Sequence, residues 1–517
     1  MERSESEDGE IREGLAREPD RHGSINRRPS APGKEAAKVF ARIGIVLIAI
    51  YFLLFAGGGI WADFSPDDLM NLHHAQVRSA WQLAKENVLF FSGVRPLGSF
   101  LYKAVYELLR LSPLPFHLIC FLLAFFNLGL LYLFAARVSG SAEVGVFTAL
   151  IGAFHTNFLP LYYNGGTCYD LLSFAAYYGA LTYYCSIRRK NQYPTGKQSI
   201  SILLLYICAL NAKEISITLP IVIAVYELIY HPARRNWIWN EGRLALLMLP
   251  VAAVYVAGKL YGPETLTQFA SYTPKVSGSM YLRTLASYLD DVFYQMNYFT
   301  PAKCLLFCCA LAGIALALRS RYLRFSFALL FIGLLPIALI PPRGLYAAYL
   351  PLVGLWSFGA VALVRIRESL NRLILKSEGG ALVTQMILFG VAAGFLIRTH
   401  THAGAFDVGW ITDQEEDIRH TIERLDGFNL HPDRGAHVLI VRDPFDAQPW
   451  GKWLTFYMIR LYYHDPSIEV EYCSAPYSSP SDWTGPYAAV LTFQDGALTR
   501  LSRCRGRSCC EGRKEPC

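Results

Sequence analysis

The chain alternates long apolar runs with short polar turns over most of its length. A membrane-spanning helix needs about 20 mostly apolar residues. Eleven segments reach or approach that length, at 43–61, 115–136, 143–162, 168–187, 199–212, 215–230, 243–261, 302–318, 323–341, 344–364 and 381–398. Only Lys213 and Glu214 separate 199–212 from 215–230, so that pair predicts either two short spans or one broken hairpin. The pattern predicts an α-helical polytopic membrane protein.

Both ends of the chain lack this pattern. Residues 1–42 mix charged side chains with Gly, Pro and Ser, a composition that cannot repay the entropy of ordering, so we expect a disordered tail. Residues 401–517 contain short apolar runs such as HVLIV and AAVLTF beside amphipathic helical stretches, which predicts a small α/β domain. We expect that domain to have a structural or acceptor-contacting role. The transmembrane module then covers 43–400.

Basic residues gather in every second loop. The basic loops hold Arg27, Arg28, Lys34, Lys38 and Arg42, then Arg188, Arg189 and Lys190, then Arg234, Arg235 and Arg243, then Arg319, Arg321 and Arg324, then Arg365, Arg367, Arg372 and Lys376. The positive-inside rule places these loops and the N-terminus in the cytoplasm. The C-terminal domain is then extracytoplasmic.

The same orientation places two long loops outside, at 61–113 and 262–300. Loops longer than simple connections need are often functional. In the first loop Leu69, Leu72 and Trp81 recur at roughly helical spacing. This spacing predicts one amphipathic helix, either lying on the membrane interface or packed on the bundle.

Composition agrees with a membrane protein. The chain of 517 residues is 53% hydrophobic and only 17% charged, which is not a soluble profile. Its net charge of +7 could suggest nucleic acid, but the basic residues lie in short loops between apolar runs. We therefore expect the lipid bilayer as a partner and no nucleic acid.

Two adjacent carboxylates, Asp67 and Asp68, follow the first apolar run. Ionisable groups at a membrane boundary cost free energy unless they are paired or used. The pair predicts a catalytic base. Alternatively, Ser65 starts a helix as its N-cap and the acids favour the positive end of the helix dipole.

Further charged residues fall on the same outer side. Arg95 and Arg343 suit a phosphate, since Arg binds phosphate in a bidentate manner, and Lys213 can act as a point charge. Asp170 begins a span after Gly165 and Gly166, where it either binds a sugar hydroxyl or caps a helix. Structural ion pairs or cations reaching the interface stay open as alternatives for the cations.

These motifs, in this order over about 61–360, resemble the GT-C superfamily of integral-membrane glycosyltransferases, and most closely its protein O-mannosyltransferase-like group. The matching residues are Asp67 and Asp68; Arg95, Pro96, Leu97, Phe116, His117 and Asn127; His155, Asn157, Gly166, Asp170 and Leu171; Lys213, Glu214 and Pro220; and Arg343, Tyr346, Tyr349, Pro351 and Gly354. The group's Glu between His155 and Asp170 is missing, Cys168 stands where that group has a small or basic residue, and tetratricopeptide repeats are absent.

The resemblance implies an inverting sugar transfer from a polyprenyl-phosphate donor to a hydroxyl of a protein, lipid or glycan. It implies Asp67, or second Asp68, as the base. Arg343, Lys213 and Arg95 would bind the donor phosphate. The candidate substrate-binding residues are Asp170, His155, Glu214 and Tyr346.

Several alternatives remain. A transporter or lipid-carrier flippase would also need many spans and buried charges. His73 and His74 beside the acidic pair raise a divalent metal, which we do not favour because adjacent histidines on a helix point apart. The Cys-rich end forms disulfides or is a frayed tail with free thiols. The compact C-terminal domain without repeats favours a bacterial inner membrane.

Overall fold

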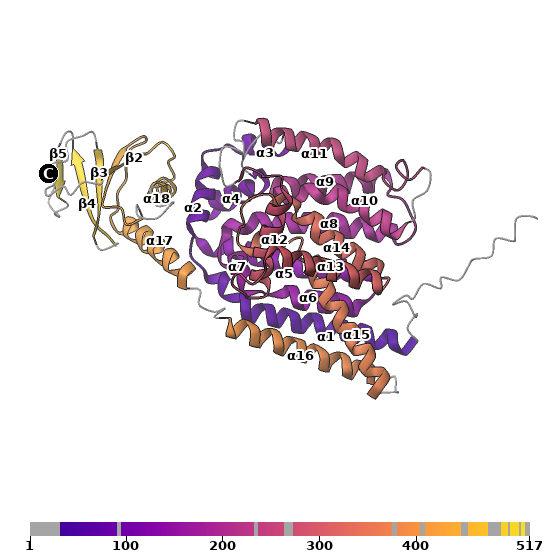
Figure 1. The fold of residues 1–517 in the computed structure, drawn as a ribbon. Helices are drawn as coiled ribbons and strands as arrows, with labels where there is room; N and C mark the ends of the chain where they lie inside the picture. Colours follow the sequence, from indigo (N-terminus) through magenta and orange to yellow (C-terminus); the bar gives the residue numbers. More distant parts are fainter. Residues whose placement is uncertain are drawn as a thin grey trace, which may run out of the picture.

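The computed structural model describes residues 31–89, 95–231, 236–262, 272–374, 380–403, 409–445, 453–473, 487–494, 497–505 and 508–511. A helical bundle fills most of the molecule, and a small sheet domain lies at one end of it (Figure 1). The α-helical polytopic class with a C-terminal α/β domain is therefore confirmed.

The first half of the bundle carries the outer loop 61–113 and the segments that hold Asp170, Lys213 and Glu214. Its elements are α1 (Ala31–Ala56), η1 (Gly57–Trp61), α2 (Pro66–Gln76), α3 (Ala80–Leu89), α4 (Pro96–Leu109), α5 (Pro113–Ser139), α6 (Ala142–Ala153), η2 (Thr156–Phe158), α7 (Leu159–Tyr163), η3 (Gly165–Thr167), α8 (Cys168–Arg188), α9 (Gly196–Ala212), η4 (Glu214–Thr218) and α10 (Leu219–Tyr230).

The second half of the bundle completes the core and leads to the C-terminal domain. Its elements are α11 (Arg243–Tyr261), α12 (Gly278–Val292), α13 (Pro301–Ala317), α14 (Arg321–Ala338), η7 (Leu345–Ala348), α15 (Val353–Ile374) and α16 (Gly380–His402).

Five described helices are long and apolar enough to cross a membrane, and the bent pair α6 with η2–α7 makes a sixth if counted as one span. Helices α9 and α13 are shorter apolar helices. The other three expected spans correspond to α8, α10 and α15, of which α10 is short and the other two fall below the same apolar criterion.

Helix α1 starts at Ala31, which corrects the expected boundary at 42. Residues 31–42 are rich in Ala and Lys, which favour helix, and they extend an existing helix without a new nucleation step. Phe40 is fully buried, and its ring centroid lies 5.8 Å from that of Phe147. The rest of the expected disordered tail, 1–30, lies outside the described residues.

The stretch of the first outer loop that holds Leu69, Leu72 and Trp81 forms two helices, α2 and α3, where the sequence predicted one; α4 follows them in the same loop. Helix α2 ends at Gln76, so Leu69 and Leu72 are buried by the bundle while Trp81 on α3 is 76% exposed. The apolar residues of α2 therefore pack on the bundle, which is one of the two predicted alternatives. On α3, the Trp81 ring points away from the bundle.

The C-terminal domain contains α17 (Gly409–Gly427), α18 (Leu454–Tyr462), β1 (His437–Val441), β2 (Glu469–Cys473), β3 (Tyr487–Gln494), β4 (Ala497–Arg505) and β5 (Ser508–Glu511). Its sheet has the order β2-β1-β3-β4-β5. Strand β1 pairs in parallel with β2 and β3, and β3–β4 and β4–β5 are antiparallel. Strand β5 lies in the segment for which a frayed tail was one alternative.

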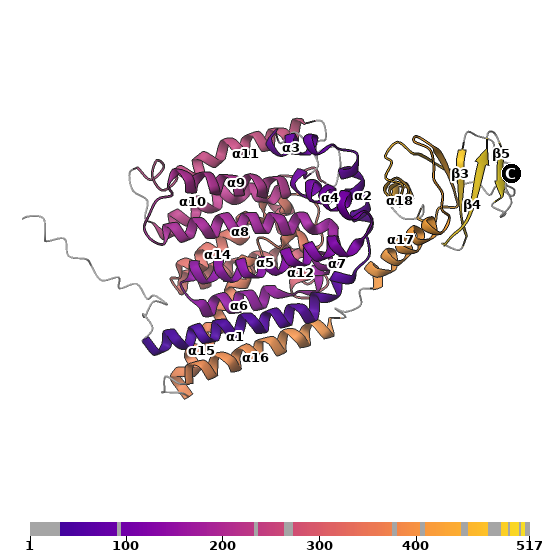
Figure 2. The same ribbon diagram turned by 180° about the vertical axis from the view of Figure 1, so that it is seen from behind.

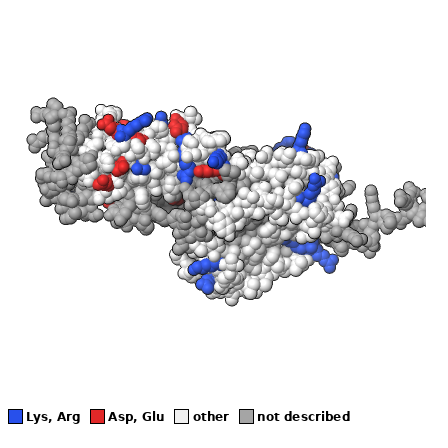
Figure 3. Space-filling model, turned by 90° about the horizontal axis from the view of Figure 1, so that it is seen from above, with Lys and Arg blue, Asp and Glu red and all other residues white. Residues whose placement is uncertain are grey.

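The ends of the bundle differ. The C-terminal domain lies at the end where α2 and α7 lie, and α1 begins at the opposite end (Figures 1 and 2). On the face in Figure 3, acidic side chains lie on the C-terminal domain and the adjoining edge, while the bundle is mostly uncharged with scattered Lys and Arg. A wide uncharged face is what a lipid-exposed helical surface requires.

Candidate active site

The two adjacent acids of the first outer loop have different environments. Asp68 is buried at the first turn of α2 and forms a capping box with Ser65: the Ser65 N–H donates to Asp68 Oδ2 at 2.9 Å, and the Asp68 N–H donates to Ser65 Oγ at 3.2 Å. Tyr102 OH also donates to Asp68 Oδ1 at 3.1 Å. The predicted N-cap at Ser65 is confirmed, and Asp68 is occupied by these contacts.

Asp67 is the accessible member of the pair. Its side chain is exposed, and Asn164 Nδ2 donates to its Oδ2 at 3.4 Å. The pKa of this carboxyl is raised, first because surrounding protein displaces water from it and second because Asp68 is close, while Arg95 and Arg343 act in the opposite direction. Asp67 therefore lies in the electrostatic field of two of the predicted cations.

A glycine lets the next segment approach this acid. A Cβ added to Gly166 would lie 2.7 Å from Asp67 Cβ, closer than real Cβ contacts. Gly165 packs against the carboxylate of Asp68 in the same way. The Gly-Gly turn before α8 thus holds both acids against the segment that leads to Asp170.

Asp170 and Lys213 form a buried ion pair. Asp170 lies in the first turn of α8 and Lys213 follows the last residue of α9, and the Lys213 ammonium donates to both carboxylate oxygens. Lys213 Nζ also lies 5.5 Å from the centroid of the Tyr346 ring. Lys213 is thus already neutralised by an acid.

A second ionic group joins Arg95, Glu214 and Lys259. Arg95 Nη2 donates to Glu214 Oε2 at 3.2 Å, and its Nε lies 3.3 Å from both carboxylate oxygens. Lys259 Nζ lies 3.8 Å from Glu214 Oε1. Burial raises the pKa of Glu214, but the two cations outweigh it and lower that pKa to about 2.

Lys259 was missed by the sequence reasoning. It lies in the last turn of α11, within a predicted span, so it reads as a cation reaching the membrane interface. The sequence feature that could have revealed it is a Lys inside an apolar segment. Burying such a charge costs free energy unless an acid pairs with it, so a partner could have been expected.

Arg343 differs from these cations. Its guanidinium lies 4.0 Å from the centroid of the Tyr272 ring, and among the described residues it has no carboxylate within ion-pair distance. Asp67 and Arg343 also both act electrostatically on Tyr346.

His155 belongs to a different cluster. Its ring stacks on Tyr294 with centroids 4.5 Å apart and 3° between planes, and its Nε2 pairs with the Val292 carbonyl at 3.0 Å. His400 lies beside both rings. Among the described residues, the contacts of His155 are thus with the end of α12 and with α16, not with the charged groups that gather near Asp67. These contacts lie at the break between α6 and α7, and the substrate-binding role of His155 stays a prediction.

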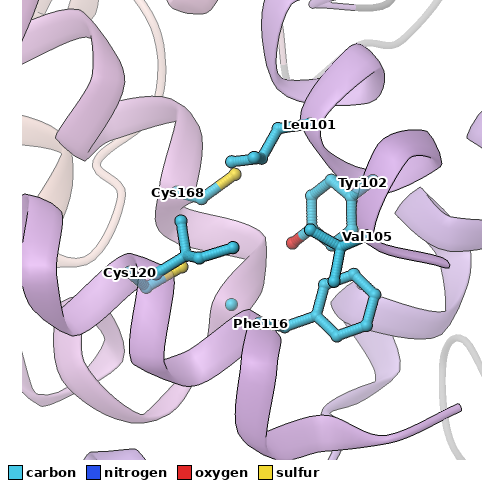
Figure 4. A pocket seen from close by; sticks show the side chains of 8 residues that line it. Leu101, Tyr102, Val105, Phe116, Cys120 and Cys168 are labelled. Atoms are coloured by element: carbon cyan, nitrogen blue, oxygen red, sulfur yellow. The ribbon is translucent and has the colours of Figure 1, made fainter. Parts of the chain in front are cut away.

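A small apolar pocket lies between α4, α5 and the start of α8 (Figure 4). Tyr102, whose hydroxyl binds Asp68, lines it together with Leu101, Val105, Phe116, Ile119, Cys120, Gly165 and Cys168. Its lining contains no carboxylate or cation, so it is separate from the charged groups. Among the described residues no group of three or more His, Cys, Asp or Glu side chains is placed to hold a metal ion.

The chain is similar in structure to known proteins of low sequence identity. No protein-family model matches the chain. No curated protein matches its sequence. The crystal structure of ArnT from Cupriavidus metallidurans bound to undecaprenyl phosphate is similar at 14% identity, over 90% of this chain and 97% of that chain, with a TM-score of 0.49. The assignment of chemistry therefore depends on the residues of this chain.

Proposed function

We propose that the protein is an integral-membrane glycosyltransferase of GT-C type, closest to the protein O-mannosyltransferase-like group. It moves a mannose-like hexose from a polyprenyl-phosphate donor to a hydroxyl of a protein, lipid or glycan, at the extracytoplasmic face of a bacterial inner membrane. One observation carries the proposal: an exposed carboxylate, Asp67, shares its electrostatic surroundings with Arg343, which has no acidic partner among the described residues.

In the proposed reaction Asp67 accepts the proton of the acceptor hydroxyl as that oxygen bonds to the anomeric carbon. The bond from the anomeric carbon to the phosphate oxygen breaks, and polyprenyl phosphate leaves with the electron pair. Attack opposite the leaving group inverts the anomeric centre. Arg343 stabilises the charge that develops on the phosphate, which lowers the barrier because the interaction strengthens in the transition state.

The two ion pairs have a supporting role in this proposal. Asp170 neutralises Lys213, and Glu214 holds Arg95 with Lys259 nearby. These groups fix the positions of charges around the donor site before it binds, which avoids reorganisation during the reaction. Of the three proposed phosphate ligands, Arg343 is therefore the first and Arg95 and Lys213 are secondary.

The base is tested by separate Asp67→Asn and Asp68→Asn variants in membranes supplied with a labelled polyprenyl-phosphate sugar. Asp67→Asn should lose sugar transfer by 100-fold or more, within the range of about 10²–10⁴ for general base catalysis. Asp68→Asn should mainly lose about 1 kcal/mol of stability through the capping box. Equal activity of Asp67→Asn and the wild type would show that Asp67 is not the catalytic base. Sugar that crosses the membrane chemically unaltered would instead indicate a transporter or flippase.

The phosphate role is tested by Arg343→Gln, with Lys275→Gln as the matched control. Lys275 is exposed in the same outer region and its backbone N–H bonds to Leu339, so the control removes one positive charge nearby. Arg343→Gln should raise the donor concentration needed for half-maximal transfer and lower the maximal rate, whereas Lys275→Gln should leave both unchanged. An identical response of the two variants would count against Arg343.

A further inference from the structure

Helix α17 of the C-terminal domain contacts the first outer loop through Arg419 and the residues beside it. Arg419 Nε lies 3.2 Å from Asp63 Oδ2. Ile418, next to it, is fully buried in the core of the bundle. Asp63 lies four residues before Asp67, so α17 contacts the same loop that carries the proposed base.

Glu415, one turn before Arg419, is buried at this contact with only 2% of its surface exposed. The Asp63 backbone faces its carboxyl group, and the Glu415 Oε1 atom has no hydrogen-bond partner among the described residues. An ionised carboxylate in this position would have one oxygen without a donor. Leaving a charged oxygen buried and unpaired is costly.

The groups that face Glu415 disfavour its charge. Asp63 from the loop and Asp68 from α2 are both acids that act on it, and Tyr163 of α7 also lies close. The nearest basic side chain on its own helix, Arg419, is engaged by Asp63 and by Glu423 at 3.0 Å. On α5, His117 pairs through Nε2 with the Asp63 carbonyl at 3.0 Å. Thus no cation in the described contacts compensates Glu415.

We propose that Glu415 is a positioning residue that holds the loop carrying Asp67 only in its neutral, protonated form, so that docking of α17 weakens as the solution becomes alkaline. The link to sugar transfer depends on the proposed function above. The docking itself depends only on the burial and contacts of Glu415.

The direction of the pH effect follows from linkage. Burial, then Asp68 and Asp63, raise the pKa of Glu415 from 4.5 to about 8 in the docked state. The docked state therefore binds one proton more than the undocked state between these values. Docking is strongest at low pH, weakens by about tenfold per pH unit as pH rises through this window, and is constant above it.

The test is hydrogen exchange on the full chain in lipid nanodiscs between pH 6 and 9, corrected for the intrinsic pH dependence of exchange. In the wild type, protection of residues 62–68 and of α17 should fall as pH rises to about 8. Glu415→Gln, which mimics the protonated carboxyl, should keep that protection nearly constant. Glu416→Gln is the matched control, because Glu416 is adjacent but 61% exposed, and it should behave like the wild type.

Sugar transfer measured over the same pH range gives a second readout. The alkaline loss of activity should be present in the wild type and in Glu416→Gln and absent in Glu415→Gln. If Glu415→Gln does not fold, Asp63→Asn replaces it: removal of one neighbouring negative charge should move the loss of protection to lower pH.

The outcomes separate the two proposals. The same pH dependence of protection in Glu415→Gln and the wild type, or no pH dependence in the wild type, would overturn the role of Glu415. A pH-dependent protection that Glu415→Gln removes, in a chain without transferase activity, would support the docking role and contradict the proposed function.

Discussion

At the scale of single residues, the charged groups near the proposed base divide by whether they are already paired. Lys213 is bound by Asp170, and Arg95 shares Glu214 with Lys259, while Arg343 rests on an aromatic ring. A cation that is already neutralised contributes less to a newly arriving phosphate. Sequence position alone does not show which of these cations is already paired, because their partners come from other helices.

The Asp170–Lys213 pair gives the first prediction. Lys213→Met should cost about 3–5 kcal/mol of unfolding free energy because it leaves the buried Asp170 carboxylate without its partner. The double variant Asp170→Asn with Lys213→Met should recover most of that loss. Thermal unfolding in detergent measures both variants.

Lys197→Met is the control for this pair. Lys197 is exposed in the first turn of the same helix, α9, and its removal should leave stability unchanged. Equal melting temperatures for the single and double variants would show that the pair is not energetically coupled. A folded double variant that still uses donor normally would also remove Lys213 from the phosphate site.

The acid side of the pH profile is a second residue-scale prediction. The proposed base must be ionised, and the pKa of Asp67 is raised because surrounding protein displaces part of its water and because Asp68 is close. Transfer should therefore fall, as pH decreases, at a higher pH than an ordinary aspartate would give. The rate of sugar transfer at saturating donor, measured as a function of pH, gives the pH at which activity falls on the acid side. Arg343→Gln should move it to still higher pH, because a charge that favours the ionised form is lost; a shift to lower pH would contradict the assignment.

At the scale of elements, breaks in the helices position the site. Helix α1 ends in the run Gly57–Gly58–Gly59, and the third glycine packs directly on the backbone of α7. A Cβ on Gly59 would overlap the Tyr162 carbonyl oxygen, whereas a Cβ on Gly57 meets no atom within 4 Å. This contact brings the start of the first outer loop against the segment that leads to Asn164 and the Gly-Gly turn.

Replacement of these glycines gives the element-scale prediction. Gly59→Ala should destabilise the protein by about 1–3 kcal/mol, the usual cost of overpacking, because rigid backbone must move. Gly57→Ala should have little effect, so it is the matched control. The yield of folded protein and its melting temperature measure the difference. Equal stability of the two variants would show that α7 can move away without cost.

Elements also mark how far sequence reasoning extends. The expected span 243–261 coincides with α11, and the expected strands and helices of the C-terminal domain match β1–β3, α17 and α18, because apolar periodicity records burial directly. The break after α6 was not predicted: its two parts meet at 73°, and the polar residues His155, Thr156 and Asn157 that mark it were included in one expected span, 143–162. The pairing of Glu214 with Lys259 was missed because contacts between distant helices leave no local pattern.

At the scale of the whole molecule, the C-terminal domain and the proposed site lie at one end of the bundle. Tyr106 of α4 donates to the Leu461 carbonyl at 2.6 Å, and the ring of His73 on α2 lies 5.1 Å from that of Phe456 on α18. Helices α2 and α4 belong to the first outer loop, so the domain and the loop are in the same compartment. The shared compartment is what allows Glu415 to act on the loop.

Labelling of exposed positions at the two ends tests this arrangement in the membrane. Ser277→Cys lies before α12 at the end with Arg343, and Lys190→Cys lies after α8 in a basic loop; both positions are exposed. A membrane-impermeant thiol reagent should label Ser277→Cys in intact cells and Lys190→Cys only after permeabilisation, because the positive-inside rule predicts a cytoplasmic basic loop. The unsubstituted chain corrects for its native cysteines. Labelling of both positions from outside would show that the two ends of the bundle do not face opposite compartments. The proposed location of Asp67 and Arg343 on the outer side would then lose its support.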